Sequence, residues 1–271
     1  MKKYRGQSIP KPGMKQMNED AVCCGLKRIA VADGAGGGGV YADCWARYLL
    51  KHLPDTPIRT SQELDDWLDS IWEAFYNTYE EKARRQGGLI LDKFYQEGSF
   101  ATLVAVWRTS PTECEWMSYG DSVAFCYEPQ SGRLQHSFTQ LADFQQPPYL
   151  INCKDPLCHE GFRHGTFCTS PHAQVFVASD ALSQYILQQY AVTRPQQFAE
   201  ELETVLSSHH KAANALKLNL QRPVRNFGKE VVRSLYRQAL SPRRLKLSLY
   251  RLCNQGVLFP DDYSIAFLPM K

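Results

Sequence analysis

Residues 18–34 read NEDAVCCGLKRIAVADG, in which two short apolar runs carry an acidic residue at their outer ends. The runs, residues 21–24 and 28–32, are interrupted by Gly25 and stopped by Asp33-Gly34, a pattern typical of two paired strands. Acids placed where successive strands end can converge when the sheet folds. This stretch therefore predicts a sheet edge at which carboxylates gather.

Two further acidic motifs, Ser179-Asp180 and Asp261-Asp262, stand at the edges of apolar, strand-like runs. Together with Glu19-Asp20 and Asp33-Gly34 they form an ordered set along the chain. Clusters of carboxylate oxygens suit Mg²⁺ or Mn²⁺ rather than zinc. Each motif alone would be interpreted as a turn or a solvated loop, but their placement together predicts a hard-metal site.

Both strands and helices are predicted elsewhere. Short β-rich segments separated by turns predict strands at residues 100–107, 114–119, 122–127, 174–178 and 263–268. Apolar spacing predicts one helix over residues 62–85, opened by a capping box of Thr60 and Glu63 and ended by Gly87-Gly88. Residues 40–50 and 181–190 also follow a helical pattern. Helices inserted between hairpins favour an α+β fold, a four-layer α-β-β-α sandwich with a central antiparallel β-sandwich flanked by helices.

The chain has 271 residues, of which 44% are hydrophobic and 22% charged. This composition excludes a largely disordered or fibrous chain, and no linker-like stretch divides residues 1–271, which favours a single domain. The basic start is followed by Pro10 and Pro12 rather than by the apolar core of a signal peptide. No run approaches the roughly 18 apolar residues that span a bilayer, so we expect a soluble, cytoplasmic protein.

Nine cysteines at irregular spacing indicate reduced, mostly buried thiols rather than a disulfide framework. The cluster of Cys153, Cys158, His159, His164 and Cys168 allows a second interpretation, because thiolate and imidazole are the ligands that zinc prefers. It contains no compact Cys-x-x-Cys pair. The favoured interpretation is a loop and a strand that contain small apolar thiols.

The ordered motifs resemble those of the metal-dependent protein phosphatases, the type 2C serine/threonine (PPM) family, and especially its compact bacterial members. The resemblance covers nearly the whole chain. Six segments carry it, in the family's order: Gly13-Met14-Lys15-Gln16-Met17-Asn18-Glu19-Asp20, Val31-Ala32-Asp33-Gly34-Ala35-Gly36-Gly37, Gly98-Ser99-Phe100-Ala101-Thr102, Tyr119-Gly120-Asp121-Ser122-Val123-Ala124-Phe125, Ala178-Ser179-Asp180-Ala181-Leu182 and Asp261-Asp262-Tyr263-Ser264.

The resemblance implies hydrolysis of phosphoserine and phosphothreonine in proteins through a dinuclear Mn²⁺ or Mg²⁺ centre and a metal-activated water. It implies that Asp33 bridges the two ions and that the carbonyl of Gly34 binds one of them. Asp180 and Asp261 would bind the other ion. A bacterial signalling role, reversing a serine/threonine kinase, is implied in the same way.

Three further acids complete the implied site. Glu19 and Asp20 would hold metal-bound waters or ligate directly. Asp121 would help to bind a third ion, or would instead fix its own turn by hydrogen bonds to nearby backbone amides. The catalytic residues that the resemblance implies are Asp33, Asp20 and Lys15.

The chain departs from the family pattern in several places. Lys15 stands where a phosphate-binding arginine is usual, which replaces a bidentate fork with a point charge. Ala181 replaces a glycine, and would cost on the order of 1 kcal/mol if its φ were positive. Ala35 stands where animal members have a histidine proposed as general acid. The substrate-choosing flap is expected at about residues 143–165, where the resemblance thins.

Residues 221–251 form a basic region that contains a single acid, Glu230. Its basic residues are Arg222, Arg225, Lys229, Arg233, Arg237, Arg243, Arg244, Lys246 and Arg251. The first five predict a stripe along one helix, whose other face holds Val232, Leu235 and Tyr236. Such a stripe at 222–251 could dock an acidic partner or, less plausibly, nucleic acid. A solvated helix face is the favoured interpretation, because no nucleic-acid motif accompanies it and the net charge is only +3.

Three functions therefore remain open. The leading one is a Mn²⁺- or Mg²⁺-dependent phosphatase that acts on phosphorylated proteins. The second is a phosphatase-fold binding or regulatory protein with weak or no turnover, which the departures at Lys15 and Ala181 would favour. The third is a module that binds nucleic acid or an acidic partner through the basic region.

Overall fold

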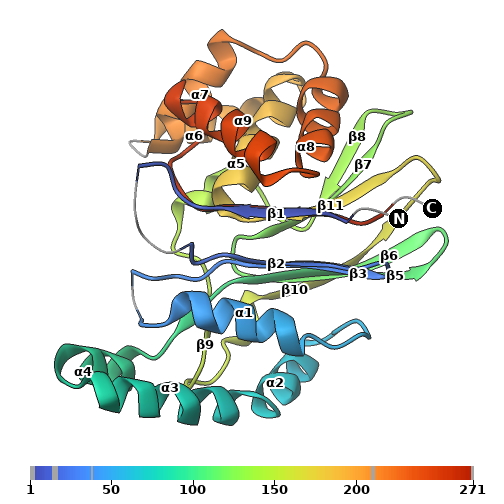
Figure 1. Cartoon of the computed structure of the whole chain (residues 1–271). Coiled ribbons are helices and arrows are strands. Elements are labelled where there is room, and N and C mark those ends of the chain that lie inside the picture. Colours follow the sequence, from blue (N-terminus) through green and yellow to red (C-terminus); the bar gives the residue numbers. More distant parts are fainter. Residues whose placement is uncertain (1–3, 14–17, 38, 209–210, 270–271) are drawn as a thin grey trace.

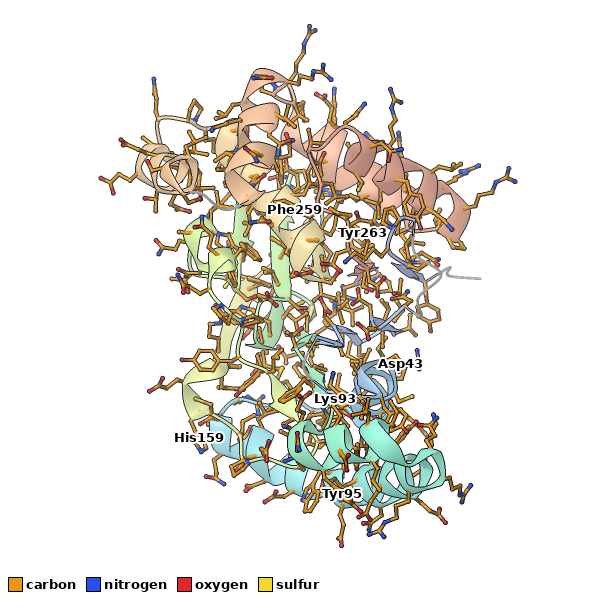
Figure 2. The ribbon with its side chains drawn as sticks, turned by 90° about the vertical axis from the view of Figure 1, so that its left-hand side faces the viewer. Asp43, Lys93, Tyr95, His159, Phe259 and Tyr263 are labelled. Atoms are coloured by element: carbon orange, nitrogen blue, oxygen red, sulfur yellow. The ribbon has the colours of Figure 1, made fainter. Side chains whose placement is uncertain are left out.

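The computed structural model describes residues 4–13, 18–37, 39–208 and 211–269. Two antiparallel sheets of five strands each face one another, and helices cover the outer side of both (Figure 1). Seen from the side, Tyr263 lies toward the helices over one sheet, whereas Asp43 and Tyr95 lie in the opposite helical layer (Figure 2). The predicted four-layer α-β-β-α sandwich is confirmed.

The strands of each sheet come from distant parts of the chain. Sheet A has the order β1 (Arg5–Ile9), β12 (Tyr263–Phe267), β11 (Gln174–Ala178), β7 (Val123–Glu128) and β8 (Arg133–His136). Sheet B has the order β10 (Phe162–Cys168), β6 (Glu113–Tyr119), β5 (Leu103–Ser110), β3 (Arg28–Ala32) and β2 (Ala21–Cys24). A small ladder joins β4 (Phe100–Ala101) to β9 (Ile151–Asn152). All of these pairings are antiparallel, as predicted.

The strand β3 shows why its sequence is apolar throughout. Ile29 and Val31 are buried in the core between the two sheets, whereas Ala30 and Ala32 are buried against the helices outside sheet B. Successive side chains of a strand point to opposite faces, so a strand covered on both faces has no position for a polar residue.

Four helices cover sheet B: α1 (Ala42–His52), α2 (Ser61–Asp69), α3 (Trp72–Gln86) and α4 (Gly88–Glu97). The outer face of sheet A carries α5 (Asp180–Val192), α6 (Ala199–Ser207), α7 (Lys211–Gln221), the π-helical turn η3 (Gly228–Val232), α8 (Arg233–Gln238) and α9 (Pro242–Asn254). Two short 3₁₀ turns, η1 (Leu141–Gln145) and η2 (His159–Gly161), lie in the connections. Among the described residues no helix is both long and apolar enough to cross a membrane.

The helix predicted over residues 62–85 is wrong, because the structure divides it into α2 and α3. The break falls at Ser70, whose hydroxyl donates to the carbonyl of Trp67 at 2.6 Å and so competes with the helical backbone bonds. The apolar spacing misled because Leu64, Leu68 and Phe75 are buried on the same side in both helices.

Other boundaries differ by less. Thr60 caps α2 as predicted, accepting the Glu63 amide at 3.1 Å, but the Glu63 carboxylate accepts from the amide of Arg59 rather than from that of Thr60. The strand predicted at 100–107 is two strands, β4 and β5. The helix α4, which begins at Gly88 directly after α3, was not predicted.

Candidate functional site

The predicted acids flank one end of the two sheets. In sheet A, Ala178 lies beside Val123 and Ile265, and in sheet B, Ala21 lies beside Ala32. These positions are strand ends, so antiparallel pairing brings the neighbouring acids to one edge. The acids at this edge, which we call the acid cluster, are Asp20, Asp33, Asp121, Asp180 and Asp261.

The carboxylate of Asp20 is the most enclosed of these groups, with 4% of its surface exposed. Neither oxygen accepts a hydrogen bond of normal geometry from any described residue. Burial raises the pKa of Asp20 to about 7, although the nearby hydroxyls of Ser264 and Ser179 lower it. A buried, unpartnered carboxylate is costly unless it is protonated or neutralised by a cation.

The pKa values of Asp33 and Asp180 are also raised. Burial raises the pKa of Asp33, and the charge of Asp20 raises it further, followed by those of Asp180 and Asp121. Burial also raises the pKa of Asp180, to which the charges of Asp121 and Asp261 add. Asp33 therefore lies within electrostatic reach of acids on both sheets.

The backbone holds Asp33 in place beside two other family-like segments. The carbonyl of Asp33 accepts a hydrogen bond from the amide of Thr102 at 2.8 Å, and the amide of Ala35 donates to the carbonyl of Phe100 at 3.0 Å. The Thr102 hydroxyl is in turn 2.8 Å from that of Ser122. The segments around residues 33, 102 and 122 thus form one connected layer beneath the acids.

Gly34 and Gly36 are required by close packing. A Cβ atom at Gly34 would lie 2.7 Å from the carbonyl oxygen of Glu19 and 2.8 Å from that of Ala42. A Cβ atom at Gly36 would lie 2.1 Å from the Glu19 carboxylate. The glycines therefore allow three chain segments to meet.

Asp180 occupies the first turn of α5. The amide of Ala181 donates to its Oδ1 atom, and the hydroxyl of Ser179 accepts the amide of Ser264 at 3.0 Å. Among the described residues only Tyr41, apart from glycines, has a positive φ. The alanine at position 181 therefore causes none of the strain considered from the sequence.

Asp262 has a structural role that sequence reasoning missed. Its two oxygens accept the amides of Lys11 and Glu19, each at 2.7 Å, and so fix the segment that leads into β2. Asp261 lies 3.8 Å from the ammonium of Lys11. Burial raises the pKa of Asp261, and Lys11 lowers it. Burial also raises the pKa of Glu19.

A second cation, Arg163, lies beside Asp121. Burial raises the pKa of Asp121 to about 6, whereas the guanidinium of Arg163 lowers it. Arg163 donates to the carbonyl of Gly120, because the pairing of Phe162 with Tyr119 aligns β10 beside this turn. No motif marks Arg163, so only the strand pairing could have found it. Lys15, the cation that the sequence singled out, lies outside the described residues.

The donor set fits a hard divalent cation by chemistry. Its carboxylates offer oxygen atoms, burial raises the pKa of Asp33 and of Asp180, and both oxygens of Asp20 lack hydrogen-bond partners among the described residues. In the described part of the chain, however, no three Asp, Glu, His or Cys side chains converge as closely as metal ligands do. The structure therefore brings the carboxylates to one edge, and they would have to move closer together to bind one ion jointly.

The cysteine and histidine cluster is spread out. Cys153 is buried, and its sulfur accepts the amide of Ser99 at 3.3 Å. Cys158 and Cys168 are exposed, so both depart from the expectation of mostly buried thiols. His164 lies 3.4 Å from the carboxylate of Glu115. No metal-binding group within the described ranges includes these residues.

No protein-family model matches the sequence, and neither does any curated protein. Solved structures match over nearly the full chain. The catalytic domain of the serine/threonine protein phosphatase PstP, in complex with two manganese ions, is 17% identical, with 97% of this chain and 96% of that chain covered and a TM-score of 0.51.

Two further structures agree. PppA, a key regulatory component of T6SS in Pseudomonas aeruginosa, is 19% identical over 97% of this chain and 96% of its own, with a TM-score of 0.50. A bacterial serine phosphatase that carries a point mutation is 11% identical over 99% of both chains, with a TM-score of 0.51. The chain therefore has the fold of the bacterial PPM (type 2C) serine/threonine phosphatases.

Proposed function

We propose that this protein is a metal-dependent phosphatase that hydrolyses phosphoserine and phosphothreonine in proteins, with residues 1–271 acting as one phosphatase domain. The observation that carries the proposal is the carboxylate of Asp20, which is buried without a hydrogen-bond partner in the described part of the chain and lies among the charges of Asp33, Asp180 and Asp262. A cluster of buried like charges is expensive, and it persists where a cation or a reaction requires it.

The residues of the chain suit distinct tasks. We assign to Asp33 the carboxylate that two ions would share, because it interacts with acids of both sheets. The Gly34 carbonyl would bind one ion, and Asp180 and Asp261 would bind the other. Glu19 and Asp20 would hold metal-bound waters or ligate directly, and Asp121 would help to bind a third ion. Two Mn²⁺ or Mg²⁺ ions, when bound, would acidify a water molecule and neutralise the phosphate.

Binding of the phosphate itself falls to cations at the rim. Arg163 and Lys11 lie beside Asp121 and Asp261, respectively. A guanidinium can hold two phosphate oxygens at once, which an ammonium cannot. We expect Arg163 to compensate in part for the lysine at position 15.

The second candidate is a phosphatase-fold protein that binds phosphorylated partners with little turnover. One observation favours it: among the described residues no three acidic side chains converge as metal ligands. If the acids do not converge around added metal, Arg163 and Lys11 could still attract a phosphate, but the protein would not hydrolyse it.

The deciding experiment is hydrolysis of a phosphothreonine peptide with Mn²⁺, with Mg²⁺ and with a chelator. We expect metal-dependent turnover that falls on the order of 10³-fold in Asp33→Asn and in Asp180→Asn. Asp92→Asn makes the same chemical change at an exposed position of α4 and should leave turnover unchanged. Turnover that survives the chelator or Asp33→Asn would reject the proposal, and a folded protein without turnover in either metal would favour the second candidate.

A further inference from the structure

A cleft of about 750 Å³ lies at the other end of sheet A from the acid cluster. Its walls include Arg5, Tyr127 and Gln174, which stand at the ends of β1, β7 and β11 that are remote from the acids. Strands of this length span about 13 Å at 3.3 Å per residue, so the two sites are separate. The helix α8 lies over sheet A near these strand ends (Figure 1).

The cleft is strongly basic. Among the residues that the structure describes, its lining includes the cations Arg5, Lys229, Arg233 and Arg237 and no Asp or Glu. The side chains of Lys229, Arg233 and Arg237 make no hydrogen bond or salt bridge to any residue in the described ranges. We call this set of residues the basic cleft. Their charges are available to a ligand.

Two features hold the walls in position. The guanidinium of Arg5 lies 3.9 Å from the ring centre of Tyr236 and donates to that residue's carbonyl at 3.1 Å. A Cβ atom at Gly228 would lie 2.2 Å from the Tyr127 hydroxyl oxygen, so glycine lets the π turn η3 lie directly on β7. Single π turns in helices are frequent at functional positions.

The basic region is not the continuous stripe that the sequence predicted. Arg222 and Arg225 precede η3, lie outside any helix and do not line the cleft. Only Lys229, Arg233 and Arg237, spaced four residues apart, share the side that faces it. The charge is therefore concentrated in one concave volume rather than drawn out along a track of the kind that a nucleic-acid backbone would follow.

The wall of the cleft contains an unsatisfied polar group. The Oε1 atom of Gln174 is buried and has no hydrogen-bond partner among the described residues. The NH₂ group of the same amide is not among the buried unpartnered atoms, and it can donate to an anion. The volume of the cleft falls within the range of small-molecule sites, and four cations would neutralise a multiply charged ligand.

We propose that the basic cleft binds a small ligand with at least two negative charges, an organic phosphate or polyphosphate, at a site separate from the acid cluster. Arg233, Arg237 and Lys229 would supply the charge, and Gln174 and Tyr127 would supply hydrogen bonds. The inference does not depend on the proposed phosphatase activity, because it uses none of the same residues.

Calorimetric titration of the full chain with pyrophosphate, in the presence of a chelator, tests this site. We expect binding that weakens at high salt and that Arg233→Gln weakens about tenfold, the effect of losing a charged hydrogen bond. Arg244→Gln removes an exposed charge from α9, outside the cleft, and should change the dissociation constant less than about twofold.

Three outcomes would overturn the proposal. Absence of pyrophosphate binding would do so, as would equal weakening by Arg233→Gln and Arg244→Gln, which would indicate nonspecific attraction to a basic surface. The third is tighter binding of an acidic peptide than of pyrophosphate, together with loss of peptide binding in Arg233→Gln. That result would identify the cleft as a protein-docking site. The Asp33→Asn variant should bind pyrophosphate as the unaltered chain does, which separates this test from that of the phosphatase.

Discussion

The acid cluster at one end of the two sheets and the basic cleft at the other end of sheet A carry opposite charges in different environments. At one end the carboxylates of Asp20, Asp33 and Asp180 are enclosed, and burial raises the pKa of each. At the other end Lys229, Arg233 and Arg237 are exposed on the helical layer. The acidic side chains are fixed by the backbone at the ends of strands. The basic groups stand on long side chains that water can solvate.

The contrast predicts how each end responds to substitution. Buried like charges destabilise the fold unless a cation neutralises them. We therefore expect the acid end to lower the stability of the protein, and a bound cation to raise it. Exposed cations cost little, so the basic end should contribute to binding without contributing to stability. A charge-removing substitution should therefore change stability at the acid end and leave it nearly unchanged at the basic end.

The largest effect is expected where the acid end is packed most closely. In Gly34→Ala the new methyl group would lie 2.7 Å from one backbone oxygen and 2.8 Å from another, and neither can rotate away. We expect a loss of about 3 kcal/mol in the free energy of unfolding, measured by urea denaturation. Gly37→Ala is the matched control, since its methyl group would meet no atom within 4 Å. Equal stability of the two variants would show that the segments around Asp33 can separate freely.

The pH dependence of stability should reveal the acid end directly. In the chelated protein the pKa of Asp20 is about 7 and that of Asp121 about 6, above an unfolded value of 3.8. Groups with a raised folded pKa stabilise the fold below the unfolded value and lose this contribution as the pH rises through the folded value. We expect Tm to fall by roughly 5 °C between about pH 5 and about pH 8, and Mn²⁺ to restore it.

A Tm that is constant over this range, or one that Mn²⁺ does not change, would contradict the picture of repelling acids. Asp20→Asn provides the internal control, because it removes the enclosed charge while keeping the shape of the side chain. Its Tm should depend less on pH and respond less to Mn²⁺ than that of the unaltered protein.

The smallest effect compares one neutralised charge at each end. At about pH 8 with chelator, Asp20→Asn should stabilise the protein by about 1 kcal/mol, since it relieves repulsion from Asp262 and Asp33. Arg233→Gln should change stability by less than about 0.5 kcal/mol, because its exposed charge has no partner among the described residues. Thermal unfolding of both variants checks the comparison, and destabilisation by Asp20→Asn would refute it.

Much of the fold followed from local pattern. The strands β2, β3 and β11 begin and end where the apolar runs and turn residues predicted. The helix break at Ser70 did not, because a periodic apolar face continues across two helices that pack on one sheet. The helix α4 was missed for a related reason, since a glycine pair that ends one helix can also begin the next.

The sequence by itself determined the acids, the glycines beside them and the order of strands whose ends carry them, because turn chemistry and side-chain alternation are local properties. Only the tertiary structure decided that Arg163 would lie beside Asp121, that Asp262 would bind two distant amides and that three of the predicted basic residues would line a cleft. These contacts join residues far apart in the chain. They arise from how two sheets and their helices meet, which no spacing within one segment encodes.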